Sequence, residues 1–417
     1  MATNFHESGE TQDHLFDDWV REYIHLSLLM DRLEPGTVDS YYGPASWRTD
    51  FENDPLPTPQ ALQTAAEGLL STLPRMGYTA GRQGFLERQV RALHTQARVL
   101  GGEQISLMEQ AQLLFDISPE RVSEDVFAEA HAKLDAALPG QGSLYERRNL
   151  WRKQFDVPTG KLLPLLNRIA DEARSRTARE VPLPHAEAIE LSLVSDKPWG
   201  GYNWYLGNMR SLIEINTDLP VSSLSLVDYL AHEGYPGHHT EHALREAVQY
   251  REKGQGEYGI TLLNSPESLI AEAIATTARK LIFPGDSDLE WAAEHIFPEL
   301  GIEVAVEQIS QVREAQRELG AVSGNASFLL NEDGRPVEEV EQYLVRWGLR
   351  RQEEAEHHIR FLSSPLSRVY VFTYYYGERL LEPLLAGPDR FKVYYEIATT
   401  SVYPSLLEEM RHTKEGA

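Results

Sequence analysis

Residues 232–239, which read HEGYPGHH, contain the side chains best suited to chemistry in this chain. Histidine is the commonest metal ligand in proteins, and a glutamate beside a metal-binding histidine is the usual base that activates water. The familiar arrangement is HExxH, in which both histidines lie on one face of a helix. Here Pro236 occupies the place of the second histidine, so the standard spacing is not met.

Pro236 and Gly237 predict how the helix around His232 is altered. Proline lacks the N–H that would bond the carbonyl of His232, and its ring clashes with that turn. We therefore expect the helix to bulge, or to break and restart, at this point. Looping out two residues places His238 where the second histidine of HExxH stands, so we favour His238 as a ligand. An unbroken helix would instead return His239 nearly to the face of His232, and His239 is the alternative.

The third ligand is open to two glutamates. Catalytic zinc usually keeps three protein ligands, and the absence of cysteine leaves His, Asp or Glu for the third. Glu267 stands at the start of the next predicted helix, and Glu272 lies further along it. The sequence Ser265-Pro266 is also an ordinary helix opening, where a glutamate is favoured by the helix dipole alone.

Three motifs together resemble a bacterial family known as domain of unknown function 885, which is itself similar to the carboxypeptidase Taq metallopeptidases. They are HEGYPGHH, DSYYGP at 39–44 and YYYG at 374–377, and the resemblance covers most of the chain. The chain departs from the family after the histidines, where a glutamine is usual and Thr240-Glu241 is found. It departs again at 267–269, where the family's Glu-Gly-Trp is replaced by ESL.

The resemblance implies roles for particular residues. The first histidine after Pro-Gly recurs in the family, which supports His238, and the family's downstream glutamate matches Glu267. The resemblance thus implies a zinc ion held by His232, His238 and Glu267, one per chain, with another divalent transition metal as the alternative. It also favours Tyr374, whose phenol would donate to the oxyanion formed when water attacks a carbonyl.

Composition limits the function classes. The 417 residues carry a net charge of −25, which argues against nucleic acid as a partner because phosphate contacts dominate that affinity. No apolar run approaches the ~20 residues that span a bilayer, and the first residues lack the pattern of a signal peptide. We therefore expect no membrane partner and a cytoplasmic location.

Helical periodicity dominates the chain. Helices are predicted from Leu15 to the stop at Pro35-Gly36, and Ser143 with Glu146 forms a capping box that opens another. Further helices are predicted at 58–73, 80–99, 107–116 and 120–137. Alternation at 189–193 and a hairpin over 202–216 predict a small antiparallel sheet directly before the metal helix. Such a sheet either holds an extended substrate at its edge or only covers the helical core.

We expect a mainly α, metallopeptidase-like fold with a cleft, forming one catalytic domain over 1–417. Its parts are an N-terminal helical lobe (1–180), the sheet and metal-binding helices (181–300), and a C-terminal helical part (301–417). The predicted function is zinc-dependent hydrolysis of amide bonds, as a peptidase or specifically a carboxypeptidase. Glu233 takes a proton from the attacking water and passes it to the leaving amine. The alternatives are hydrolysis of small acyl-amides or esters, and metal or peptide binding without turnover.

Overall fold

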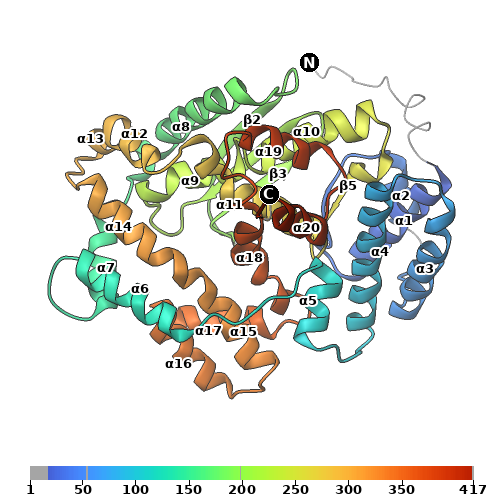
Figure 1. The fold of residues 1–417 in the computed structure, drawn as a ribbon, viewed down its shortest axis with the longest axis horizontal. Coiled ribbons are helices and arrows are strands. Elements are labelled where there is room, and N and C mark those ends of the chain that lie inside the picture. Colours follow the sequence, from blue (N-terminus) through green and yellow to red (C-terminus); the bar gives the residue numbers. More distant parts are fainter. Residues whose placement is uncertain (1–16, 53–54, 198, 416–417) are drawn as a thin grey trace.

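A computed structural model describes residues 17–52, 55–197 and 199–415, and it is mainly helical, with 66% helix and 7% strand (Figure 1). This confirms the predicted mainly α fold class. The elements before residue 181 are α1 (Asp18–Leu33), β1 (Val38–Tyr41), α2 (Ala45–Glu52), α3 (Pro59–Thr72), η2 (Leu73–Arg75), α4 (Ala80–Leu100), α5 (Leu107–Phe115), α6 (Glu124–Ala137), α7 (Leu144–Lys153) and α8 (Thr159–Glu180).

Local capping explains where several of these helices begin. The side chain of Asp17 caps α1, while Leu15 lies outside the described residues. The predicted capping box of Ser143 and Glu146 is present at α7, with both of its hydrogen bonds. Helix α6 begins later than its predicted start at 120, because Ser123 accepts a hydrogen bond from a backbone N–H of its first turn.

A three-stranded sheet precedes the metal-site helices, and it differs from the prediction. Its strands are β2 (Ala188–Val194), β3 (Gly201–Tyr205) and β4 (Arg210–Asn216), in the order β2-β4-β3. Strand β3 pairs with β4 antiparallel, as the predicted hairpin requires, but β2 pairs with β4 in parallel. The sheet is therefore mixed rather than antiparallel. Strand β4, whose Ile213 and Ile215 are buried, lies between β2 and β3, so β3 is an edge strand.

A second, two-stranded sheet joins distant parts of the chain. Strand β1 pairs antiparallel with β5 (Ile260–Leu262), so the DSYYGP segment lies beside residues that follow the histidine motif. Neither strand was predicted, because three or four residues are too few to show an alternating pattern. The pairing carries Asp39 to the neighbourhood of the metal-site helices.

The histidine motif and the glutamates occupy α9 (Ser223–Glu233), α10 (His238–Leu244) and α11 (Pro266–Ile282). Between α10 and β5 lie η3 (Arg245–Glu252), which is π-helical, and η4 (Gly256–Gly259). The later elements are α12 (Ser287–His295), α13 (Phe297–Leu300), α14 (Val306–Arg317), η5 (Glu318–Ala321), α15 (Val322–Asn331), α16 (Val337–Gly348), α17 (Gln352–Ser363), η6 (Ser367–Val369), α18 (Phe372–Leu381), α19 (Arg390–Thr399) and α20 (Pro404–Glu415).

Helix α11 lies near the middle of the molecule, with α9, α18 and α19 around it (Figure 1). Every residue of α11 except Thr276 and Lys280 is buried. A helix that is buried all round belongs to the core, so polar side chains on it need partners within the protein. This makes Glu267 and Glu272 informative, since both are carboxylates on a core helix.

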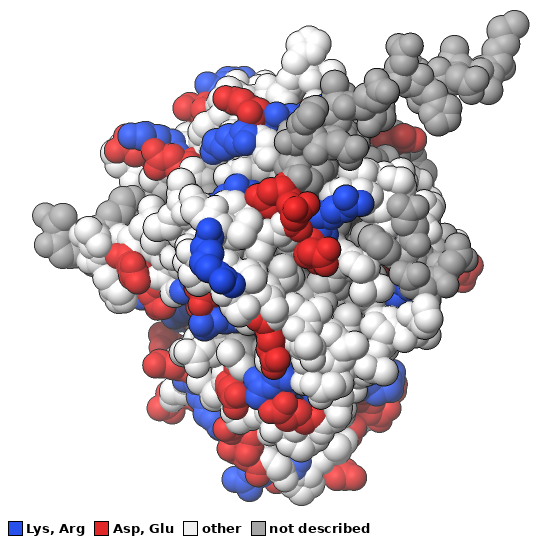
Figure 2. Space-filling model, turned by 90° about the vertical axis from the view of Figure 1, so that its right-hand side faces the viewer, with Lys and Arg blue, Asp and Glu red and all other residues white. Residues whose placement is uncertain are grey.

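Charged side chains of both signs are interspersed on the face drawn in Figure 2. None of the helices in the described part of the chain is both long and apolar enough to cross a membrane.

Candidate metal centre

The helix that carries His232 breaks and restarts, as Pro236 predicts. Helix α9 ends at Glu233, and α10 begins at His238. The loop between them folds back onto the end of α9: the N–H groups of Gly234 and Tyr235 both donate to the carbonyl of Leu230, at 2.9 and 3.1 Å. The two histidines are therefore held by separate helices that meet at a tight turn.

Gly237 is required by this turn because of close packing. Its N–H donates to the carbonyl of Ala231 at 2.9 Å, and a Cβ at this position would lie only 1.8 Å from the carbonyl oxygen of His232. Only glycine fits such an approach of two backbone segments. The result is that the rings of His232 and His238 lie 4.8 Å apart, at 84° to each other.

Glu272 completes a group of three candidate metal ligands. Its Oε2 lies 3.6 Å from Nε2 of His232 and 3.9 Å from Nε2 of His238, and one ligand atom from each residue lies within 4.8 Å of the others. Ligand atoms about 2.0–2.2 Å from a tetrahedral zinc ion lie about 3.3–3.6 Å from one another. A contraction of a few tenths of an ångström up to about 1 Å would therefore close this group around an ion.

The chemistry of these three groups also suits a metal. Oε1 of Glu272 accepts a hydrogen bond from the hydroxyl of Tyr370 at 3.0 Å, whereas Oε2 is buried and lacks a hydrogen-bond partner among the described residues. Burial lowers the pKa of His232 and of His238, which favours neutral imidazoles with a free nitrogen lone pair. The ring of His232 is held by the backbone carbonyl of Ala275, an arrangement typical of metal-binding histidines.

Glu267, the favoured third ligand, lies elsewhere, and this preference is corrected in favour of Glu272. Glu267 forms a buried ion pair with Arg245 and accepts a hydrogen bond from Nε2 of Gln89 at 2.7 Å. Five residues along a helix correspond to a turn of roughly 140° beyond one revolution, so Glu267 and Glu272 point in different directions. The buried guanidinium of Arg245 needs counter-charges, and Glu267 supplies one of them beside Glu241.

His239 is committed to the protein interior, which agrees with the preference for His238. Its side chain is fully buried, with Nε2 3.0 Å from a carboxylate oxygen of Glu187 and Nδ1 2.9 Å from Oγ of Ser211. The same carboxylate accepts a hydrogen bond from the hydroxyl of Tyr235 at 2.5 Å. These contacts anchor the turn between α9 and α10 to the sheet, one residue away from His238.

Glu233, the predicted base, lies at the end of α9 close to the three ligands. Burial raises its pKa to about 8, and the charges of Glu272 and Asp39 add to that increase. The amide of Asn203 on strand β3 donates to the backbone carbonyl of Glu233 at 2.5 Å, which ties the end of α9 to the sheet edge. A carboxylate with a raised pKa is well matched to proton transfer near neutral pH.

Tyr374, the predicted oxyanion donor, lies on α18 beside the same site. Helix α18 packs closely on α11 at Gly377, where an added Cβ would lie 3.1 Å from the Cβ of Ala273. Tyr374 is 46% exposed overall. Partial burial of its phenol, together with the charges of Glu272 and Glu233, raises the pKa of the hydroxyl. The phenol therefore stays protonated and can donate a hydrogen bond into the site.

Three side chains near the candidate ligands, Tyr370, Tyr202 and Asp39, received no role from the sequence. Tyr370 holds Glu272, and Tyr202 of strand β3 donates its hydroxyl to a carboxylate oxygen of Asp39. Asp39 in turn influences both Glu233 and Glu272. The DSYYGP motif drew attention to Asp39, but only the pairing of β1 with β5 brings that segment to the site.

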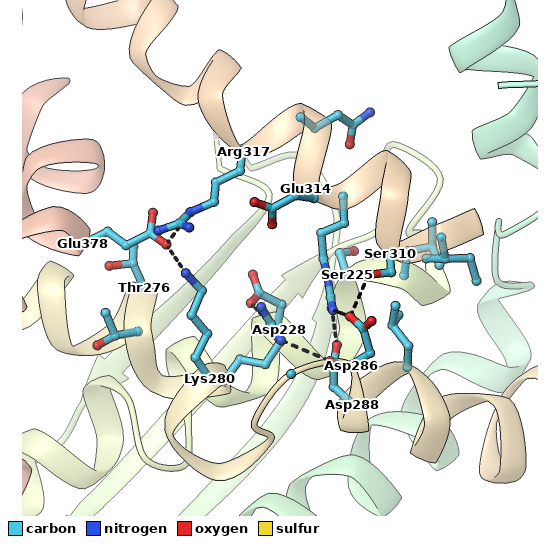
Figure 3. A pocket seen from close by; sticks show the side chains of 18 of the residues that line it. Ser225, Asp228, Thr276, Lys280, Asp286, Asp288, Ser310, Glu314, Arg317 and Glu378 are labelled. Carbon is cyan, nitrogen blue, oxygen red and sulfur yellow. Dashed lines mark hydrogen bonds and ion pairs between the residues drawn. The ribbon is translucent and has the colours of Figure 1, made fainter. Parts of the chain in front are cut away.

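Figure 3 shows a cavity of about 970 Å³ from close by. His232 forms part of its wall, so the cavity adjoins the candidate metal centre. Along α9 its wall continues from His232 to Asp228 and Ser225, and along α11 it includes Thr276 and Lys280. Residues spaced by three or four lie on one face of a helix. The cavity therefore follows the face of α9 that carries His232, and it runs along the part of α11 that comes after Glu272.

The far part of this cavity is lined by an ion-pair network. Nζ of Lys280 donates to Glu378 at 2.7 Å and to Glu382 at 2.8 Å, and Arg317 pairs with the same two carboxylates. Glu378 follows Tyr374 by one helical turn on α18. The cavity thus offers a polar, charged surface that begins beside the candidate metal ligands.

No protein-family model matches the sequence, and no curated protein matches it. Among solved structures, a "putative lipoprotein" from Colwellia psychrerythraea is similar in fold, with a TM-score of 0.53 and 13% identity, over 87% of this chain and 71% of that one. A second protein of that description, from Shewanella oneidensis, has a TM-score of 0.46 and 12% identity over 97% and 84%. At this identity the first likeness shows a shared fold alone.

Proposed function

We propose that this protein is a metal-dependent hydrolase of amide bonds, with one zinc ion held by His232, His238 and Glu272. The observation that carries the proposal is the buried, unpartnered Oε2 of Glu272, which faces the Nε2 atoms of both histidines. Two imidazoles and a carboxylate are the ligand set of a familiar class of catalytic zinc sites, which keep one position open.

The metal, Glu233 and Tyr374 would each have a different role in hydrolysis. A bound metal supplies Lewis-acid polarisation at the carbonyl and lowers the pKa of water. Glu233 accepts a proton from the attacking water and later delivers it to the nitrogen of the leaving amine, so the C–N bond breaks as an N–H bond forms. Tyr374 donates a hydrogen bond to the carbonyl oxygen as negative charge develops on it.

A peptide is the substrate class that the site favours over a small acyl-amide or ester. The cavity beside His232 has a volume of about 970 Å³, near the upper end of the ~300–1,000 Å³ of ligand pockets. A small acyl group would leave most of it empty. Helix geometry places Lys280 about 12 Å along α11 from Glu272, a span that an extended peptide covers in three or four residues.

The test is hydrolysis of a mixed peptide library by zinc-loaded protein, followed by mass spectrometry. We expect cleavage by the wild type and a loss of about 10²–10⁴-fold in rate for Glu233→Gln with the zinc retained. Trimming from the C-terminus would identify a carboxypeptidase, and internal products would identify an endopeptidase. Cleavage of N-acyl amino acids alone would favour the small-amide alternative, and inertness toward both would favour a non-catalytic binding protein.

A cytoplasmic location is part of this proposal, and the absence of cysteine from the whole chain is compatible with it. The Colwellia psychrerythraea protein of similar fold is described instead as a "putative lipoprotein". Fractionation of cells that express the native gene, followed by immunoblotting, tests the location. Recovery in the membrane fraction would contradict it.

A further inference from the structure

Three aromatic side chains gather on and beside the edge strand β3, outside the group of ligands described above. The ring centroids of Tyr202 and Trp204 lie 4.5 Å apart, and Trp199 lies 5.5 Å from the first and 5.9 Å from the second. Trp204 is 37% exposed, whereas Trp199 and Tyr202 are half-buried. We call these three residues the aromatic platform.

The aromatic platform is continuous with the candidate metal centre. Tyr202 donates its hydroxyl to Asp39, and Asn203, the residue between the two aromatic side chains of the strand, donates to the carbonyl of Glu233. Alternate side chains of a strand point to opposite faces, so Tyr202 and Trp204 share one face while Asn203 faces α9. The strand that carries the platform is thus fastened directly to the proposed base.

Hydrogen bonds within the protein hold two of the three platform rings, those of Tyr202 and Trp204. Trp204 donates its indole N–H to a carboxylate oxygen of Glu214 at 2.9 Å, and the hydroxyl of Tyr202 is held by Asp39. Aromatic side chains fixed in this way offer a large contact area at little cost in conformational entropy. Trp204 remains 37% exposed despite these contacts, so its ring is accessible to a ligand.

Strand β3 also offers a place for a peptide backbone. It bonds to β4 on one side only, and within the described chain its other side has no strand partner. An extended peptide that pairs with such an edge aligns its alternate side chains with the faces of the sheet. One of those side chains would then lie over the platform while the neighbouring amide bond lies beside Glu233.

We propose that Trp199, Tyr202 and Trp204 form the subsite that selects an aromatic or large aliphatic side chain next to the amide bond that is cut. This inference rests on the proposed function, because it assigns the substrate class of the same site. A hydrophobic subsite of this kind discriminates between side chains by roughly 10–200-fold.

The experiment compares two peptides that differ only by phenylalanine or alanine next to the cleaved bond. In the wild type we expect kcat/KM for the phenylalanine peptide to exceed that for the alanine peptide at least tenfold. Trp204→Ala and Trp199→Ala should each reduce this ratio severalfold at unchanged zinc content. Because the ratio is measured within one preparation, a partly unfolded variant does not imitate the result.

Leu150→Ala serves as the matched control, since Leu150 is also apolar and exposed, at 66%, but lies on helix α7, outside the aromatic platform and outside the cavity lining. It should leave the ratio unchanged. A wild-type ratio near one, or a ratio that Trp204→Ala does not alter, would overturn the inference.

Binding separates failure of the platform from failure of the proposed function. Zinc-loaded Glu233→Gln protein should bind the labelled phenylalanine peptide more tightly than the alanine peptide in fluorescence anisotropy, with the preference lost on adding Trp204→Ala. If the wild type cuts neither peptide but this preference persists, hydrolysis is rejected and the platform stands. Equal binding of both peptides rejects the platform, whatever the activity.

Discussion

The free oxygen of Glu272 distinguishes the two glutamates of helix α11. Oε2 of Glu272 faces His232 and His238, whereas both oxygens of Glu267 already have partners, Arg245 and Gln89. A buried polar atom without a partner is costly, and a metal ion would provide the missing interaction. At the scale of single residues, we therefore expect the metal content of a variant to depend on which of the two glutamates is replaced.

We expect Glu272→Gln and His238→Ala to lose bound zinc, and Glu267→Gln to retain it. Elemental analysis of protein purified without chelator measures the zinc content. Glu267→Gln should still lower stability, by roughly 1–3 kcal/mol, because it removes one of the two buried carboxylates, Glu241 and Glu267, that pair with Arg245. His357→Ala, at an exposed position on α17, is the control that should change neither quantity. Loss of zinc from Glu267→Gln with retention in Glu272→Gln would reverse our assignment.

Zinc affinity should depend on pH through Glu272. Burial raises the pKa of its carboxyl to about 7 in the metal-free protein, despite the hydrogen bond from Tyr370. Below that pH a proton occupies the carboxylate and competes with the metal, whereas above it the carboxylate is free. Both histidines have lowered pKa values and compete little near neutrality.

We therefore expect the apparent zinc affinity to fall by up to about tenfold for each pH unit below 7 and to level off above it. Competition with a chelating dye on both sides of pH 7 measures this. An affinity that stays constant down to pH 5 would show that Glu272 does not take part.

At the scale of elements, the junction between α9 and α10 sets the distance between the two histidines. Gly237 allows the junction because its Cα lies against the carbonyl of His232. A methyl group there would force the two helix ends apart and move His238 away from its partner.

Gly237→Ala should therefore lose zinc and destabilise the fold by roughly 2–4 kcal/mol. Gly68→Ala is a matched control within α3, where an added Cβ meets no atom within 4 Å. That change should stabilise the protein by about 0.5–1 kcal/mol, as expected for alanine in an open helical position. Denaturant unfolding measures both, and a Gly237→Ala protein with normal stability and zinc content would refute the packing argument.

At the scale of the whole molecule, a bound metal would link α9 and α10, which meet at a tight turn, to α11, which lies further along the chain. Helices α9 and α10 follow the sheet, while α11 is the buried central helix. A ligand that binds only the folded state adds about 2.7 kcal/mol of stability at a free concentration of 100 times its Kd.

We accordingly expect Tm to rise by several degrees when chelator-treated protein is reloaded with zinc. Differential scanning calorimetry measures this shift, and Glu272→Gln should abolish it. A rise of equal size in Glu272→Gln would place the stabilising metal elsewhere.

Features that depend on neighbouring residues could be predicted from the sequence. Pro236 and Gly237 forecast the break in the metal helix, and Ser143 with Glu146 forecast the start of α7. The preference for His238 over His239 as a metal ligand rests on the length of the looped-out segment, and it stays a prediction. The helix break and the cap could be predicted because a missing N–H, a steric clash or a cap acts within one turn of helix.

Features that depend on distant contacts required the tertiary structure. Both glutamates of α11 fit the local pattern, and only the position of Arg245 decides that Glu267 is its counter-charge. Strand β2 pairs in parallel with β4 rather than with β3, the strand that follows it along the chain. Asp39 reaches the site only through the pairing of β1 with β5, more than 200 residues apart. Sequence thus determined the helices and the histidine motif, while long-range packing decided which glutamate of α11 lies beside the two histidines, because burial and charge pairing join residues that no local spacing relates.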